Sequence, residues 1–253
     1  YSSRATVRFE KNDFKGAFED CSAAIKADPK HANAYNMRGL ARLKQGDYSG
    51  AVDDFTEAVQ IDRGLGVAYL NRADANIADG DLKGAVEDYS AFLELNPGDA
   101  QIYYRRGALK GQMRDFKGAI EDYDKSIEIQ PNAGLTFYNR GVAKQDSGDV
   151  TGAIEDYTAA AALNPNWAEP YYNRGTVKYG VGDIGGAVED FGKAINANAK
   201  FLSAYDNRAK IFYQMERYEE ALADIKKMID INPSLKKSLE PVITDIKNKL
   251  ERK

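Results

Sequence analysis

Residues 32–65 read ANAYNMRGLARLKQGDYSGAVDDFTEAVQIDRGL. The first part, Asn33–Gln45, carries apolar residues at helical spacing and stops at Gly46. Asp47 is a good N-cap for the run Tyr48–Ile61, which alternates apolar and charged residues with the same helical period. The stretch therefore predicts two helices joined by a tight turn.

The same pattern returns along the chain with a constant period of 34 residues. Each copy holds an aromatic residue, then an arginine three positions later, an alanine sixteen positions later and an aspartate nineteen positions later. The aromatic residues are Tyr1, Tyr35, Tyr69, Tyr103, Phe137, Tyr171 and Tyr205. This regularity, without insertion or deletion, predicts seven tandem copies of one structural unit.

Small residues explain how the two helices of a copy would pack. A glycine or alanine follows each arginine, as at Gly141, and it should face the alanine of the second helix, as at Ala153. An aromatic residue such as Tyr157 would then fill the seam beside them. One helix pair cannot bury its own apolar face, so successive pairs must stack. No segment shows the alternation of a strand, and the prediction is an all-α stack of helix pairs.

The spacing of aromatic residue, small residue, alanine, aromatic residue and proline in 34-residue units resembles the tetratricopeptide repeat (TPR). The motif Tyr-Asn-Arg-Gly at Tyr138–Gly141 and Tyr172–Gly175 resembles a variety of this repeat that is common in bacterial proteins. The resemblance implies a right-handed α-solenoid, whose first helices line a concave face and whose second helices line the outside. It also implies a role in binding other proteins.

The predicted boundaries follow from the period. The seven repeats are 1–31, 32–65, 66–99, 100–133, 134–167, 168–201 and 202–235, and the first of them lacks its start. Residues 236–253 should form a C-terminal capping helix, with Pro241 in its first turn. Its apolar stripe consists of Leu239, Val242, Ile243, Ile246 and Leu250.

The recurring arginine and aspartate predict a structural ion-pair ladder. Arg106 and Asp122 lie eight residues to either side of Arg114, at the turn. In an antiparallel pair of helices both would sit about 12 Å from the turn and face each other. We interpret the seven pairs as structural and not as catalytic acid–base pairs. A second column, with glycine early in six second helices, is unexplained by the sequence, because glycine in a helix costs up to about 1 kcal/mol.

Composition and scarce residues exclude several functions. His31 and Cys21 are the single histidine and the single cysteine, so no histidine relay, disulfide or cysteine-rich metal site is expected. We predict no catalytic residue, no metal and no cofactor. The net charge of −4 argues against nucleic acid as a partner, and no apolar stretch is long enough for a membrane span. The lone cysteine fits the reducing cytoplasm, although a periplasmic protein could have the same composition.

A candidate partner-binding face follows from the resemblance, which directs residues beside the aromatic–arginine column into the groove. Asparagine amides recur there and could pair with the main chain of an extended peptide, while tyrosines offer large contact areas. The candidate residues are Leu70, Asn71, Tyr104, Arg105, Tyr138, Asn139, Tyr172, Asn173, Tyr179, Asn207 and Tyr213. The alternative is that the tyrosines pack between first helices and the amides merely face water.

Three functions are compatible with these observations. The first is a non-catalytic scaffold that binds an extended segment of a partner protein. The second is a targeting region of a larger multidomain enzyme, as occurs in glycosyltransferases with such repeats. The third is a structural scaffold that self-associates through its uncapped N-terminal end, because Tyr1 begins inside a first helix.

Overall fold

The computed structural model describes residues 2–252, in which helices are joined by short turns and no strand occurs. Tyr1, the first member of the aromatic column, lies outside the described residues. The chain divides into two compact units, Tyr1–Gln130 (unit 1) and Pro131–Lys253 (unit 2).

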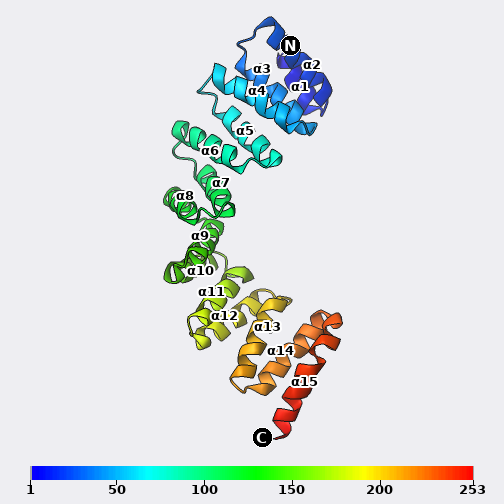
Figure 1. The fold of residues 1–253 in the computed structure, drawn as a ribbon, viewed down its shortest axis with the longest axis vertical. Coiled ribbons are helices and arrows are strands. Elements are labelled where there is room, and N and C mark those ends of the chain that lie inside the picture. Colours follow the sequence, from blue (N-terminus) through cyan, green and yellow to red (C-terminus); the bar gives the residue numbers. More distant parts are fainter. Residues whose placement is uncertain (1, 253) are drawn as a thin grey trace. The chain divides into compact units, whose positions relative to one another are not determined.

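Unit 1 consists of four helix pairs. Its helices are α1 (Ser2–Glu10), α2 (Phe14–Ala27), α3 (Ala32–Lys44), α4 (Tyr48–Ile61), α5 (Gly66–Asp79), α6 (Leu82–Leu95), α7 (Ala100–Gln112) and α8 (Phe116–Ile129). Each helix packs against the next in chain order, so the pairs are stacked in sequence (Figure 1).

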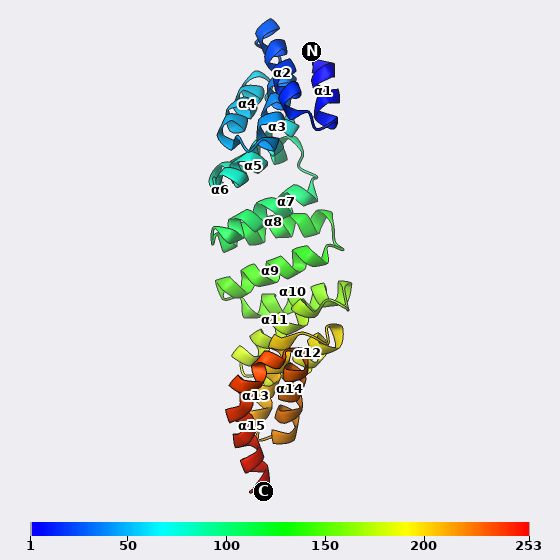
Figure 2. The same ribbon diagram turned by 90° about the vertical axis from the view of Figure 1, so that its right-hand side faces the viewer.

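Unit 2 consists of three helix pairs and a last helix. Its elements are α9 (Gly134–Ser147), α10 (Val150–Leu163), α11 (Ala168–Gly180), α12 (Ile184–Ala197), α13 (Leu202–Gln214), α14 (Tyr218–Ile231), the 3₁₀ helix η1 (Pro233–Leu235) and α15 (Lys236–Glu251). Figure 2 shows α9 to α12 layered in chain order. The predicted all-α stack of helix pairs is confirmed.

The seam within a pair is built as the small-residue columns predict. Ala153 and Tyr157 of α10 are fully buried against α9. A Cβ atom at Gly141 would lie only 2.9 Å from the Tyr157 ring, so glycine is what admits the ring. Burying such a ring contributes roughly 1.5–3 kcal/mol.

The unexplained glycine column belongs to the N-caps of the second helices. The side chain of Asp149 accepts a hydrogen bond from the backbone N–H of Gly152 at 3.0 Å. A Cβ atom on that glycine would lie 2.2 Å from Asp149 Oδ2. The same arrangement opens α2, α4, α6, α8 and α12. In α14 the cap position is Arg217 and the glycine is replaced by Glu220, and these two side chains form an ion pair instead.

The predicted ion-pair ladder is confirmed, and it lies within each helix pair. Arg106 Nη2 lies 2.6 Å from Asp122 Oδ1, and the aspartate is almost fully buried. The same guanidinium also donates to Ser90 Oγ at 2.8 Å, on the second helix of the preceding repeat. Arg72 and Arg174 make the same second contact, to Thr56 and Thr158, so these three arginines set the register of their own pair and join it to the preceding one.

Two of the buried aspartates, Asp190 and Asp88, differ in their second partner and in the direction of their pKa shift. Lys178 Nζ lies 2.9 Å from Asp190, which also pairs with Arg174. Burial raises the pKa of Asp190, but the hydrogen bonds and charges of both cations outweigh it, and the pKa is lowered. At Asp88 the neutral Asn76 stands in place of that lysine, burial dominates, and the pKa is raised.

The last helix caps unit 2. Ile243 and Ile246 are buried against α13 and α14, and Leu239, Val242 and Leu250 pack beside them. Pro241 lies in the second turn of α15, not in the first as predicted, because the helix already begins at Lys236. Pro241 is exposed, so water can solvate the carbonyl that lacks a donor.

Candidate functional site

The eleven candidate residues fall into two sets, one in each compact unit. Leu70, Asn71, Tyr104 and Arg105 belong to unit 1. Tyr138, Asn139, Tyr172, Asn173, Tyr179, Asn207 and Tyr213 belong to unit 2, on the first helices α9, α11 and α13. Each set is therefore a site to be judged by itself.

In unit 2, hydrogen bonds between consecutive first helices connect the tyrosines and the amides. Asn173 Nδ2 on α11 donates to the hydroxyl oxygen of Tyr138 on α9 at 3.0 Å. One repeat later, Asn207 Nδ2 donates to the Tyr172 hydroxyl oxygen at 3.2 Å. Each amide has two N–H donors and a carbonyl oxygen, so its hydrogen-bonding capacity exceeds the one bond to the tyrosine hydroxyl.

A third link of the same kind lies about two turns further along α11 and α13. The Tyr179 hydroxyl donates to Gln214 Oε1 at 3.0 Å, and both side chains are exposed. Gln214 was not among the predicted residues, because its column shows no regularity in the other repeats. Together these residues form the tyrosine–amide face: Tyr138, Tyr172, Asn173, Tyr179, Asn207 and Gln214.

The tyrosine rings of this face are held by packing within the repeats. The Tyr138 ring centroid lies 5.8 Å from that of Tyr157 and 4.7 Å from that of Trp167. The Tyr172 ring lies 5.7 Å from Phe191 in the same way. Burial raises the pKa of Tyr138, although the hydrogen bond from Asn173 opposes the shift. The rings are thus half-buried supports, whereas the hydroxyls and amides form the polar edge.

The unit 1 set is arranged differently. Asn71 Nδ2 donates to Asn36 Oδ1 at 2.8 Å, so amide pairs with amide between α5 and α3. Leu70 is half-buried against the core of its own repeat. Asn36 was not predicted, although it lies in the same column of the repeat as Leu70.

Arg105 in unit 1 is engaged by its own chain. Its guanidinium forms an ion pair with Asp74 and lies 4.9 Å from the centre of the Tyr89 ring. The Tyr104 ring packs against Tyr123 at 6.0 Å. Arg105 and Tyr104 are thus engaged by side chains of their own unit.

The two remaining unit 2 candidates differ in position. Asn139 is half-buried on α9. Tyr213 links α13 to the capping helix: its hydroxyl donates to Asp245 Oδ2 at 2.5 Å and accepts from Lys249 Nζ at 2.6 Å. The hydrogen bond from Tyr213 holds the pKa of Asp245 below its ordinary value. Tyr213 therefore fixes α15 in place.

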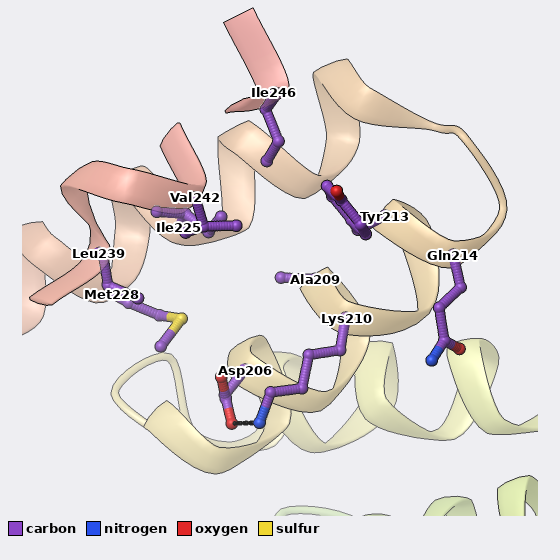
Figure 3. Close-up of a pocket in the computed structure, with 10 residues that line it drawn as sticks. All are labelled: Asp206, Ala209, Lys210, Tyr213, Gln214, Ile225, Met228, Leu239, Val242 and Ile246. Atoms are coloured by element: carbon purple, nitrogen blue, oxygen red, sulfur yellow. Dashed lines mark hydrogen bonds and ion pairs between the residues drawn. The ribbon is translucent and has the colours of Figure 1, made fainter. Parts of the chain in front are cut away.

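Two pockets adjoin the tyrosine–amide face. The repeat-six pocket, about 300 Å³, lies between α11, α12 and α13 and is lined by Thr176, Tyr179, Phe191, Asn207, Lys210, Ile211 and Gln214. The cap pocket, about 410 Å³, lies between α13, α14 and α15 (Figure 3). Lys210 and Gln214 line both pockets, which makes the two pockets neighbours on one surface.

The single histidine and the single cysteine both occupy structural positions. His31 is the N-cap of α3, and its Nδ1 accepts a hydrogen bond from the Ala34 N–H at 3.3 Å. Cys21 is buried, and burial raises the pKa of its thiol to about 11. Over residues 2–252, no cluster of three or more His, Cys, Asp or Glu side chains is placed to hold a metal ion. Within the same residues, no helix combines the length and the apolar character needed to cross a bilayer.

Stacked helix pairs with a polar first-helix face define a helical-repeat scaffold of the kind that binds other proteins. Family models of the tetratricopeptide repeat match residues 3–65, 67–99, 100–133 and 202–235, and a further TPR model matches residues 144–182. The chain belongs to the tetratricopeptide repeat family.

Solved structures show the same fold. The C-terminal part of a TPR repeat-containing protein from Cytophaga hutchinsonii has 18% identity and a TM-score of 0.81, over 95% of this chain and 98% of that one. MamA has 24% identity and a TM-score of 0.63, over 68% and 94%. YrrB, described as a TPR protein with an unusual peptide-binding site, has 18% identity and a TM-score of 0.64, over 74% and 97%. A search of the curated proteins gave no match.

Proposed function

We propose that unit 2 binds an extended segment of a partner protein across the tyrosine–amide face, without catalysing a reaction. The observation that carries this proposal is the repeated pair of tyrosine hydroxyl and side-chain amide on consecutive first helices. An extended peptide presents main-chain N–H and C=O groups along its length. Amides that recur once per repeat offer matching donors and acceptors.

The packing of this face favours binding over mere exposure to water. The Tyr138 and Tyr172 rings are held against neighbouring rings, and each hydroxyl holds the next amide. A side chain that is already ordered loses less conformational entropy when a ligand binds. The peptide-binding site described for YrrB, whose fold is the same, gives further support.

The test uses the whole chain and a random library of 12-residue peptides displayed on phage. Peptides selected on the native chain are synthesised, and their dissociation constants are measured by fluorescence polarisation. We expect Asn173→Ala/Asn207→Ala to weaken binding at least tenfold, since each lost hydrogen bond is worth about 1 kcal/mol. Asn196→Ala/Asn248→Ala is the matched control, because both asparagines are exposed on other helices. Equal binding by the native chain and the Asn173/Asn207 variant would contradict the proposal.

A further inference from the structure

An aromatic pair that fills the seam of the helix pairs in repeats four to six is missing from the seventh repeat. In repeats four to six the pairs are Tyr104–Tyr123, Tyr138–Tyr157 and Tyr172–Phe191, with ring centroids 6.0, 5.8 and 5.7 Å apart. One period later the same two positions hold Asp206 and Ile225. The seventh repeat therefore lacks both rings at these two positions.

The cap pocket lies where these two rings would be. Both Asp206 and Ile225 line it, and its volume is about 410 Å³. The repeat-six pocket is its counterpart one period earlier, where Phe191 keeps its ring, and that pocket has only about 300 Å³. The loss of the rings thus accompanies a larger cavity.

The first repeat shows the same relation independently. Cys21 occupies the column that holds Phe55 in the next repeat. A pocket of about 410 Å³ in unit 1 is lined by Cys21, together with residues of α1 and α3. A pocket again lies beside the position where the aromatic residue of this column is replaced.

The cap pocket is apolar inside and polar at its mouth. Its apolar walls are Ala209, Ile225, Met228, Leu239, Val242 and Ile246, contributed by α13, α14 and α15 (Figure 3). At the mouth, Lys210 Nζ lies 2.6 Å from Asp206 Oδ2, so the two charges neutralise each other. An uncharged apolar group therefore fits the interior better than an ion or a cluster of waters.

The capping helix keeps this pocket open. Tyr213 of α13 is hydrogen-bonded to both Asp245 and Lys249 of α15, which holds the two helices together beside the pocket. Ile243 and Ile246 anchor α15 in the core. A wall held in this way resists collapse into the cavity, so the pocket is preformed.

We propose that the cap pocket takes an aromatic side chain, Phe or Tyr, of the partner segment, which stands in for the missing ring pair. This inference rests on the proposed function, because the segment that carries the ring would cross the adjoining tyrosine–amide face. Lys210 and Gln214 line both this pocket and the repeat-six pocket, so the cap pocket is continuous with the tyrosine–amide face. A ring bound there packs beside the Tyr213 ring and the Met228 thioether, two groups that favour aromatic contacts.

The first test detects the binding of an aromatic ring in the cap pocket directly and needs no peptide partner. The chain contains four methionines, so methyl labelling of methionine for NMR gives four separate signals. One of them belongs to Met228, which lines the cap pocket. N-acetyl-phenylalaninamide should shift the Met228 signal in a saturable manner through the ring current, and leave that of Met113, which does not line the cap pocket, in place. N-acetyl-leucinamide should bind at least fivefold more weakly. An unmoved Met228 signal, or equal binding of both amides, would overturn the aromatic assignment.

The second test fills the pocket with the ring of the other repeats. Ile225→Phe, which copies Phe191, should weaken the Met228 response and the binding of aromatic library peptides at least tenfold. Asp206→Tyr restores the other ring, and gives an independent result if the first variant does not fold. The matched control is Ile129→Phe at an exposed position, which should bind like the native chain.

The two proposals fail in different ways. Peptides that depend on Asn173 and Asn207 but bind Ile225→Phe and Asp206→Tyr normally would contradict the pocket inference alone. A Met228 response to the phenylalanine amide, without any peptide that depends on those asparagines, would contradict the proposed function.

Discussion

One position in the repeat illustrates how a single neighbouring residue can affect the pKa of a buried aspartate. The residue four positions after the paired arginine is lysine in repeats four to six, as at Lys178, but it is Asn76 in repeat three. With two cations, Asp190 has a lowered pKa, whereas Asp88 has a raised pKa because burial outweighs the hydrogen bonds it accepts. An amide can donate a hydrogen bond to the carboxylate, but it adds no charge to offset the lost hydration.

Asn76→Lys should therefore stabilise the protein at neutral pH. In the native chain, the raised pKa of Asp88 means that its charged form disfavours folding once the pH exceeds that pKa. A lysine should lower the pKa below the unfolded value of about 3.9, adding about 1 kcal/mol at pH 7. This gain should disappear as the pH falls through the new folded pKa.

Urea unfolding of Asn76→Lys and the native chain between pH 3 and pH 7 would measure this gain. Asn196→Lys, which adds the same charge at an exposed position on α12, is the control and should change the stability little. A gain that is equally large at pH 3 would show that the lysine acts through something other than the charge of Asp88.

At the scale of the helix, two adjacent glycines of α12 serve different purposes. The Gly186 N–H donates to the N-cap carboxylate of Asp183 at 2.9 Å, and a Cβ atom there would lie 2.2 Å from Asp183 Oδ2. Around Gly185 no neighbouring atom lies within 4 Å of an added Cβ atom. A contact therefore requires glycine at Gly186 but not at Gly185.

Alanine at these two positions should have opposite effects. Gly185→Ala should stabilise the protein by up to about 1 kcal/mol, because alanine is the better helix former. Gly186→Ala gains the same helix propensity but displaces the cap, whose loss costs about 1 kcal/mol, and it also forces the side chain of Asp183 to move. Thermal unfolding followed by circular dichroism should place the Gly186→Ala midpoint below that of Gly185→Ala. The reverse order would mean that the cap is dispensable.

The elements of the candidate site were only partly predictable. The sequence placed Tyr138 and Asn173 on first helices, but not the hydrogen bond between them, because the direction of a side chain depends on neighbours such as Trp167 at 4.7 Å from the Tyr138 ring. Gln214 was missed because no periodic column marks it. The cap pocket did leave a signal, since Asp206 and Ile225 interrupt two aromatic columns, but a volume follows only from packed helices.

At the scale of the molecule, the period was sufficient to predict the fold. A constant step of 34 residues fixes which helices are sequence neighbours, and in each unit these are the helices that pack together. Arg106, which reaches both Asp122 and Ser90, shows that the same side chain holds a pair together and joins it to the preceding one. The division into two compact units had no sequence signal, because the period runs through Gln130 and Pro131 without a break.

Because each repeat contacts mainly its neighbours in the sequence, a destabilising substitution should reduce stability mostly in its own repeat and the adjacent ones. Asp190→Ala removes the partner of Arg174, whose guanidinium is nearly buried, and should cost about 3 kcal/mol in its repeat. Hydrogen exchange followed by mass spectrometry should show the largest loss of protection in α11 and α12, a smaller loss in α10 and α13, and the smallest in α9. Glu189→Ala is the adjacent control, because that carboxylate is exposed and pairs only with Lys193 at the surface. A uniform loss from α9 to α15 would instead mean that unit 2 unfolds as one cooperative block, in which the repeats have no separate stabilities.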